Sequence, residues 1–246
     1  GASRLRRIPQ QIQEQAQAKA RIQELNFLSK TMMKTFHSIL AAYFLFSSSV
    51  MAVEVNATAV AGDYHSFFLR PDGSLWATGL NDSGQLGDVS KVNRNQSVKI
   101  DTDVRVVAAG SSHSMYVKAD GSLWAMGQNT YGQLGDGSDT NRTSPKRVVD
   151  LNVSAIALGG AHSLYLKTDG SLWAMGQNTY GQLGDGTNVD RNVSVMVVAT
   201  GVSSIAAGKD HSLFLKTDGS LWAMGQNTYG QLGDGTNVDR NVSVMV

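Results

Sequence analysis

Four histidines recur at almost constant spacing and are the first residues of this chain that could do chemistry. Each belongs to a G-x-x-H-S motif, and they are His65, His113, His162 and His211. Zinc ligands must all lie about 2 Å from one ion, whereas one histidine in each unit of a repeat array stays apart from the next. The pattern therefore predicts no metal site, and it predicts structural histidines that bond to backbone within their own unit.

The serine that follows each histidine could form a nucleophile–base pair with it, but strand geometry argues against this. Adjacent side chains on a strand point to opposite faces. The sequence also contains no G-x-S-x-G elbow, no phosphate loop ending in Lys and no H-E-x-x-H motif. Because the chain has no cysteine, thiolate chemistry and disulfides are excluded. We expect a protein that is not an enzyme and has no catalytic residues and no cofactor.

Aspartates supply two further candidate patterns. Asp-Gly pairs begin at residues 72, 120, 169 and 218, and their position between apolar runs predicts type I′ hairpin turns. The D-G-T-N-V-D segments at 185–190 and 234–239 carry oxygen ligands, which raises a calcium hypothesis. Their spacing does not match the calcium loop D-x-[DN]-x-[DN]-G with its distant Glu, so we do not favour it.

The elements that carry these residues form four repeats with a period near 49 residues. The tryptophans show the same period and lie at Trp76, Trp124, Trp173 and Trp222. In the second unit we expect strands at 104–108, 114–118 and 122–126, a glycine-rich loop, and a short strand at 146–149. Four short strands in a period of 40–50 residues are typical of a propeller blade. The tryptophans are expected to pack between blades, with each indole N–H bonded locally.

Several spaced motifs of these repeats resemble the regulator of chromosome condensation family. They are V-A-A-G-S-S-H-S-M-Y-V at 107–117, I-A-A-G-K-D-H-S-L-F-L at 205–215, and the D-G-S-L-W-A-M-G-Q-N-T-Y-G-Q-L-G-D-G stretches at 120–137, 169–186 and 218–235. The resemblance covers residues 59–246 and implies an all-β propeller of four-stranded blades. We place the blades at about 59–105, 106–154, 155–203 and 204–246. The first unit departs from the pattern at Val60.

The number of repeats is a second departure, because the family's usual ring has seven blades and this chain has four. An open arc would leave two apolar blade faces uncovered. Three arrangements are open: the natural chain continues beyond Val246, two chains self-associate, or the arc stays open. Because the sequence stops inside an almost perfect copy, we favour the first, so the chain would be a fragment of a larger ring.

Differences between the four copies mark candidate contact residues. The two residues before each histidine vary while their surroundings are nearly fixed, and these pairs are Asp63 and Tyr64, Ser111 and Ser112, Gly160 and Ala161, and Lys209 and Asp210. Such positions are either unconstrained or tuned for contact. Tyrosines in the N-T-Y-G loops are the other candidates, at Tyr131, Tyr180 and Tyr229. Tyrosine on a rigid loop offers contact area at low entropic cost, although packing onto the next blade explains it equally well.

The N-terminal residues differ from the repeats. Residues 1–32 form a polar, Gln- and Ala-rich leader with a loose helical face, which we interpret as a possible upstream artefact. Residues 33–52 follow the pattern of a secretory signal peptide, with Lys34, an apolar run at 39–46 and a cleavage site after Ala52. The apolar run is too short to span a bilayer, so we expect no stable membrane insertion after cleavage. A buried helix and a retained anchor are the alternatives.

The net charge also differs between these two parts of the chain, and its sign in the repeats limits the class of partner that they could bind. Residues 1–52 have a net charge of +5 and residues 53–246 one of −4, so the repeats offer no basic surface for nucleic acid. Sequons at Asn192 and Asn241 fall in expected strands, which mildly favours a bacterial source.

These observations favour a secreted, periplasmic or cell-surface scaffold that binds another protein through its loops. Members of the family include exchange factors for a small GTPase and a secreted inhibitor of β-lactamases. The resemblance therefore implies an alternative, an exported effector acting on a small GTPase. A polysaccharide-active enzyme on a propeller scaffold is the alternative from another class.

Overall fold

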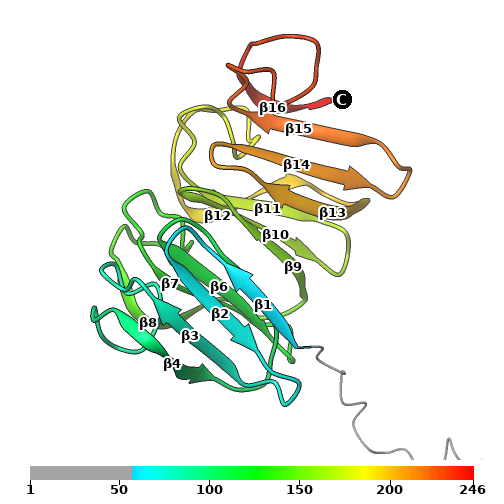
Figure 1. The fold of residues 1–246 in the computed structure, drawn as a ribbon. Helices are drawn as coiled ribbons and strands as arrows, with labels where there is room; N and C mark the ends of the chain where they lie inside the picture. Colours follow the sequence, from blue (N-terminus) through cyan, green and yellow to red (C-terminus); the bar gives the residue numbers. More distant parts are fainter. Residues whose placement is uncertain (1–56) are drawn as a thin grey trace, which may run out of the picture. The chain divides into compact units, whose positions relative to one another are not determined.

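The computed structural model describes residues 57–246, where all regular structure is antiparallel β-sheet (Figure 1). Sixteen strands form four four-stranded sheets, and the strands of each sheet lie side by side in chain order. We call these sheets blades 1 to 4. The all-β fold of four-stranded blades is thus confirmed. The expected leader at 1–32 and signal peptide at 33–52 lie outside the described residues.

Strands occupy equivalent positions in every blade. The first strands are β1 (Thr58–Ala61), β5 (Val104–Ala109), β9 (Val153–Leu158) and β13 (Val202–Ala207). The second strands are β2 (His65–Leu69), β6 (His113–Lys118), β10 (His162–Lys167) and β14 (His211–Lys216). The third strands are β3 (Leu75–Gly79), β7 (Leu123–Gly127), β11 (Leu172–Gly176) and β15 (Leu221–Gly225). The fourth strands are β4 (Arg94–Asp101), β8 (Arg142–Val149), β12 (Arg191–Val198) and β16 (Arg240–Met245).

The first strands of blades 2 to 4 begin two residues earlier than the expected blade boundaries at 106, 155 and 204. In β5 the pairing with β6 shifts register between Val104 and Val106. Such an irregularity leaves one residue unpaired in the ladder. Arg105 is that residue, and it lies within the strand that the sequence predicts at 104–108.

The fourth strands are longer than the sequence indicated. β8 begins at Arg142 instead of Lys146, because Gly127 still pairs with Arg142 beyond a register shift in the β7–β8 ladder. Most of the early residues of this strand are polar and partly exposed. An edge strand of this kind carries no alternating apolar signal.

The hairpins between second and third strands form at the Asp-Gly pairs, but with a different turn type. In blade 2 the Gly121 N–H donates to the Lys118 carbonyl, and only Gly121 has a positive φ, of 82°. A type I turn followed by a left-handed glycine has this pattern. Asp120 stays right-handed and accepts bonds from the N–H and hydroxyl of Ser122.

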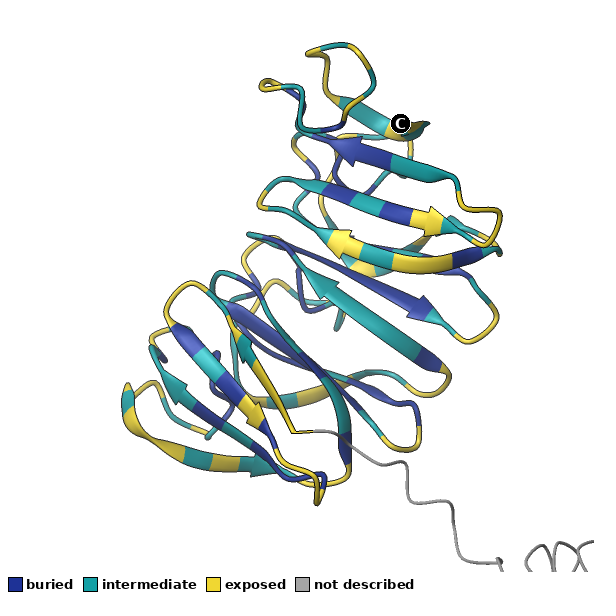
Figure 2. Ribbon diagram, turned by 45° about the vertical axis from the view of Figure 1, so that its right-hand side comes forward, coloured by how far each residue is buried: buried dark blue, intermediate teal, exposed yellow. Residues whose placement is uncertain are grey.

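The core of the molecule lies in the seams between neighbouring blades (Figure 2). Each tryptophan after blade 1 packs against the cluster shared with the preceding blade, as Trp124 does on the cluster of Phe67 and Leu75. Its indole N–H donates to Ser122, two residues earlier. Both expectations for these tryptophans are confirmed. No helix of the described residues is long and apolar enough to cross a membrane.

Candidate functional site

The turns between first and second strands converge from all four blades on one cavity of about 330 Å³. Its lining consists of residues 61–63, 109–111, 158–160 and 207–209, and we call it the turn cavity. Glycines bring these turns together, because a Cβ on Gly110 would lie 2.7 Å from the Gly159 carbonyl oxygen of the next blade. Between blades 3 and 4 the Gly160 N–H donates to the Lys209 carbonyl at 2.9 Å.

The variable pairs predicted as contact residues are brought together by this arrangement. Asp63, Ser111 and Lys209 line the turn cavity. Tyr64, Ser112 and Asp210 directly follow them in the same turns. Tyr64 is 73% exposed, and Asp63 and Lys209 are exposed as well. The cavity therefore has an acid on one blade, a cation on another, and small residues between them.

Gly160, from the third variable pair, belongs to the same lining. The small residues before the turns, Ala61 and Ala207, line the cavity too, and the sequence comparison missed them because their position differs little between the copies.

The loop tyrosines lie at the same end of the blades but outside the turn cavity. The loop after each third strand starts beside the turn, since the Gln128 N–H donates to the Ser112 carbonyl. Tyr131 is 38% exposed, whereas Tyr229 in the last blade is 87% exposed. Tyr180 is also only partly exposed. Tyr229 is the tyrosine without a following blade beside it in the structure, and it is the most exposed of the three. This difference supports packing against the next blade as one role of Tyr131 and Tyr180.

The histidines bond across the seams and not within their own blades, which corrects the expectation from the sequence. His65 Nε2 lies 2.8 Å from the Ser114 hydroxyl of blade 2. The same contact joins His113 to Ser163 and His162 to Ser212, each at 2.9 Å. The Ser114 hydroxyl donates to the Gln85 carbonyl of blade 1, so it accepts the histidine N–H.

A Ser–His pair therefore exists, although adjacent residues do not form it. The Ser114 hydroxyl donates its hydrogen bond to a carbonyl oxygen and accepts one from the His65 N–H, so the imidazole has no lone pair directed at this hydroxyl and cannot act as its base. Both side chains are buried. The pair joins two neighbouring blades by hydrogen bonds and does not have the geometry of a nucleophile with its base.

Burial also keeps these imidazoles neutral. Loss of solvation lowers the pKa of His65 and of His162 to about 4. It lowers the pKa of His113 to about 3, with a further contribution from the neighbouring His162 and His65. Nδ1 of each of these rings has no hydrogen-bond partner within the described residues.

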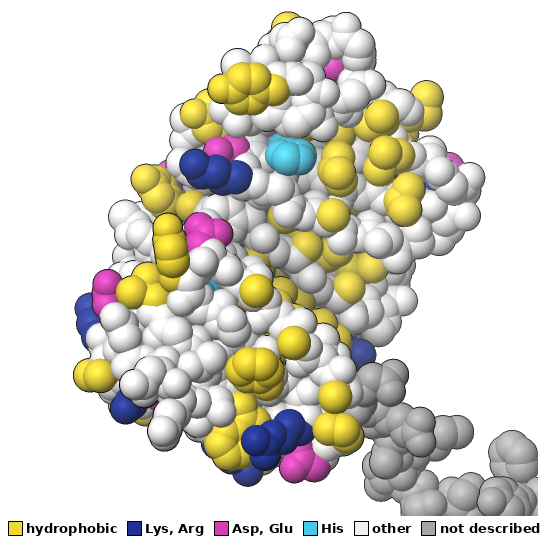
Figure 3. Space-filling view, in the orientation of Figure 1, with side chains coloured by type: hydrophobic (Ala, Val, Ile, Leu, Met, Phe, Trp, Pro, Cys, Tyr) yellow, Lys and Arg dark blue, Asp and Glu magenta, His cyan; other side chains and the backbone are white. Residues whose placement is uncertain are grey.

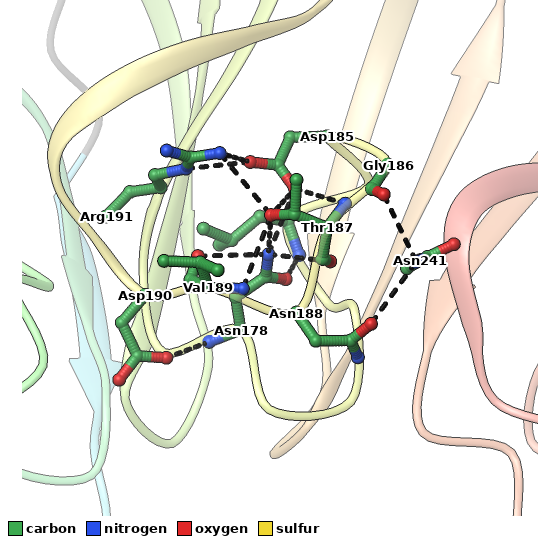
Figure 4. Close-up of polar contacts among 10 residues, drawn as sticks. Asn178, Asp185, Gly186, Thr187, Asn188, Val189, Asp190, Arg191 and Asn241 are labelled. Atoms are coloured by element: carbon green, nitrogen blue, oxygen red, sulfur yellow. Dashed lines mark hydrogen bonds and ion pairs between the residues drawn. The ribbon is translucent and has the colours of Figure 1, made fainter.

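The segment considered for calcium is a loop whose aspartate is bonded within the loop, and Asn241 of blade 4 donates to its Gly186 carbonyl and Asn188 side chain (Figure 4). Asp185 Oδ2 pairs with Arg191 at 2.7 Å, and Oδ1 accepts bonds from the backbone and hydroxyl of Thr187. Buried Asn178 donates to the same carboxylate and to the Thr187 and Val189 carbonyls. Partial burial raises the pKa of Asp185, but the bonds from Thr187, Arg191 and Asn178 outweigh it and hold the pKa below its ordinary value.

The same ion pair occurs in the equivalent loops of the other three blades. Its members are Asp88 with Arg94, Asp136 with Arg142, and Asp234 with Arg240. Carboxylate oxygens that already accept this many bonds are not presented to a cation. No group of three or more acidic or histidine side chains suited to a metal occurs among residues 57–246.

Blades of four antiparallel strands, packed face to face so that one turn of each meets the others at a common cavity, define the class of β-propeller proteins. The chain belongs to the RCC1-like domain family, whose model matches residues 37–246. The resemblance read from the repeats is thus confirmed. A search of curated proteins gave no match.

Solved structures of the same family share the fold. Human WBSCR16 is 26% identical with a TM-score of 0.69, over 78% of this chain and 52% of that one. Prp20p from Saccharomyces cerevisiae, described with its binding properties to Gsp1p and histones, is 24% identical with a TM-score of 0.70, over 78% and 51%. Yeast RCC1 (Prp20) bound to Kap60 is 23% identical with a TM-score of 0.69, over 78% and 49%. The chain spans about half the length of these proteins.

Proposed function

We propose that this chain is a scaffold that binds another protein through the turn cavity and the loops around it, without catalysing a reaction itself. One observation carries the proposal. The first residue of each pair that varies between otherwise similar blades lines one cavity, where Asp63 and Lys209 are exposed with opposite charges. A surface that varies on a constant scaffold is suited to recognition.

Other solved members of the family support a protein partner. Prp20p is described with binding to Gsp1p and histones, and yeast RCC1 with Kap60. A polysaccharide-active enzyme needs a pair of available carboxyl groups. The repeated hairpin aspartates of this chain instead bond to the serine two residues later.

Binding is tested with a charge-swapped variant of the turn cavity, Asp63→Lys with Lys209→Glu. The matched control is Ala119→Lys with Thr217→Glu, which places the same charges in exposed hairpins at the other end of the blades. Proteins captured by the wild type are quantified by mass spectrometry. We expect the cavity variant to reduce capture of a specific partner at least about tenfold, which corresponds to about 1.4 kcal/mol, while the control retains it. Equal capture by all three proteins would contradict the proposal.

An effector acting on a small GTPase is the second candidate, favoured by the described binding of Prp20p to Gsp1p. Release of a fluorescent guanine nucleotide from Gsp1p distinguishes the two. Acceleration by the wild type, lost in the cavity variant, would support the GTPase role. Unchanged release would leave plain binding as the function.

We also propose that the protein is exported, to the periplasm, the cell surface or the medium, and that its source is bacterial. The proposed export rests on the charge, apolar run and small residues of segment 33–52. The proposed bacterial source rests on the sequons at Asn192 and Asn241, which lie in strands β12 and β16. N-terminal sequencing of the exported protein is expected to begin at Val53. An exported protein that still begins upstream of residue 33 would contradict cleavage there.

A further inference from the structure

The outer edge of blade 3 is an exposed sheet edge in the middle of the array. β12 pairs with β11 and has no second neighbour among the strands of residues 57–246. Blades 2 and 4 pack on the two faces of blade 3, through the clusters that contain Met175 and Leu172. Because blades stack face to face, a further blade at either end of the array would not lie along β12. This edge is therefore independent of where the sequence begins and ends.

Backbone groups along β12 are available from its third residue onward. The Gly137 N–H in the loop of blade 2 donates to the Asn192 carbonyl at 2.9 Å and covers the start of the strand. From Val193 to Val198, no described strand runs along the outer side. A strand edge of this kind presents alternating N–H and C=O groups, and the partner that satisfies such a row is another extended strand.

The exposed side chains at this edge are apolar. Val193 is 54% exposed and Met196 is 53% exposed. Neither a charged residue nor a proline occurs between Arg191 and Lys209. Exposed edge strands are usually protected against pairing by lysine, proline or other charged residues, and β12 lacks this protection beyond its first residue.

The equivalent edges of blades 1 and 2 carry such protection. β8 contains Pro145, Lys146 and Arg147 in succession, and β4 contains a lysine and an aspartate. Val195 and Met196 of β12 hold the same ladder positions as Lys146 and Arg147, opposite the alanine and the tryptophan of the third strand. Blade 3 therefore has two apolar residues at the positions where blade 2 has two positive charges.

These residues also decide whether an edge can pair with itself. Two copies of a strand related by a two-fold axis run antiparallel and bring like residues close together. Like charges opposite each other are destabilising, so Lys146 and Arg147 oppose self-pairing of β8. In β12 a two-fold axis at Val195 would place Val193 opposite Val197 of a second copy, with no charge at any of these positions.

A second copy of this chain supplies the strand that matches β12. The edge offers only backbone groups and uncharged side chains, so it has no charge with which to select an oppositely charged partner. The second copy presents an edge of the same length and the same character. The net charge of −4 on residues 53–246 is small, and positive and negative side chains lie interspersed on the face drawn in Figure 3. Repulsion between two copies is therefore weak.

We propose that two copies of this chain pair through their β12 strands, which run antiparallel and join the two copies of blade 3 into one continuous sheet. Each copy contributes the four strands of its own blade 3. The contact gives a closed two-fold dimer, because both copies use the same edge. The proposal does not depend on partner binding at the turn cavity, whose lining contains no residue of β12.

Moving the protection of blade 2 onto blade 3 tests this pairing. β16 repeats the sequence of β12, so every protein in this comparison carries Val244→Lys with Met245→Arg. In this background the chain with unchanged β12 is compared with one that also carries Val195→Lys and Met196→Arg. The second is expected to fold, because β8 holds lysine and arginine at these positions. Light scattering and sedimentation from about 1 to 200 µM are expected to show that it dimerises at least about tenfold more weakly.

The matched control adds the same two charges elsewhere. Ser144→Lys changes an exposed position of β8 and Gln96→Arg an exposed position of β4, and neither strand takes part in the proposed contact. The control is expected to dimerise like the chain with unchanged β12. Circular dichroism and thermal melting show whether each variant is folded.

Hydrogen exchange tests the contact without any substitution. In the unaltered chain, we expect backbone amides of residues 193–198 to exchange more slowly at about 200 µM than at about 1 µM, while those of β8 exchange equally at both concentrations. Exchange in β12 that does not change with concentration would overturn the proposal. If that exchange were slow at both concentrations, another segment of the same chain would be covering the edge.

Two results of the mass measurements would also overturn the proposal. One is a chain with unchanged β12 that stays monomeric at about 200 µM. The other is a folded β12 variant that dimerises as strongly as its control, which would place the contact between copies on another surface.

Discussion

Lowering the pH from 7 to 5 is expected to remove on the order of 5 kcal/mol from the free energy of unfolding. Three buried histidines cause this. An unfolded histidine has a pKa of about 6.5, whereas burial lowers the pKa of His65, His113 and His162 to between about 3 and about 4. The unfolded chain therefore binds three protons that the folded chain does not. Their stabilising contribution is complete above pH 6.5 and is lost as the pH falls toward 4.

Chemical denaturation at a series of pH values measures this effect. Three protons correspond to a slope of about 4 kcal/mol per pH unit near pH 5. A His113→Gln variant, which removes one of the three groups, is expected to lower the slope to about 3 kcal/mol per pH unit. The aspartates with lowered pKa lose their contribution at more acidic pH, so the two effects separate. A flat unfolding free energy between pH 6.5 and 4.5 would contradict the buried, neutral state of these rings.

A Gly159→Ala substitution is expected to destabilise the protein by about 3 kcal/mol. The added methyl group would overlap the His162 ring and lie 2.5 Å from the Gly208 carbonyl oxygen of the next blade. The ring is held by its bond to Ser212, and the carbonyl belongs to backbone. Neither can move aside unless blades 3 and 4 separate.

Gly219→Ala is the control for the Gly159 prediction. A Cβ on Gly219 would meet no atom within 4 Å, but the φ of +85° disfavours alanine there, so a loss of about 1 kcal/mol is expected. Thermal and urea unfolding of both variants provides the comparison. A Gly159→Ala variant that is as stable as the control would show that the seam is not tightly packed at this turn.

Local patterns made the blades predictable from the sequence. The Asp-Gly hairpins, the alternation of 114–118 and the local bond of Trp124 each depend on residues a few positions apart. The fourth strands were less visible because Arg142 and its neighbours are mostly polar and partly exposed and follow an irregular ladder. The turn type was misjudged because the Ser122 bonds hold Asp120 in a right-handed conformation.

The candidate site depended on relations between blades, which a pattern within one blade does not contain. His65 and Ser114 are 49 residues apart in the chain and 2.8 Å apart in the seam. Their pairing could have been anticipated only from how one blade is rotated against the next. The variable residues were found by comparing copies, but their convergence on one cavity also required the arrangement of the blades.

The His–Ser–carbonyl bond has the same direction at each of the three seams. In each seam the histidine N–H of the earlier blade donates to the serine hydroxyl of the later blade, and that hydroxyl donates back to a glutamine carbonyl of the earlier blade, so every repeat has one histidine–carbonyl edge and one serine edge. Duplicating or deleting one complete repeat would leave every remaining seam with its two correct edges. Evolution can therefore lengthen or shorten this array by unequal recombination within the gene, one blade at a time, without redesigning an interface.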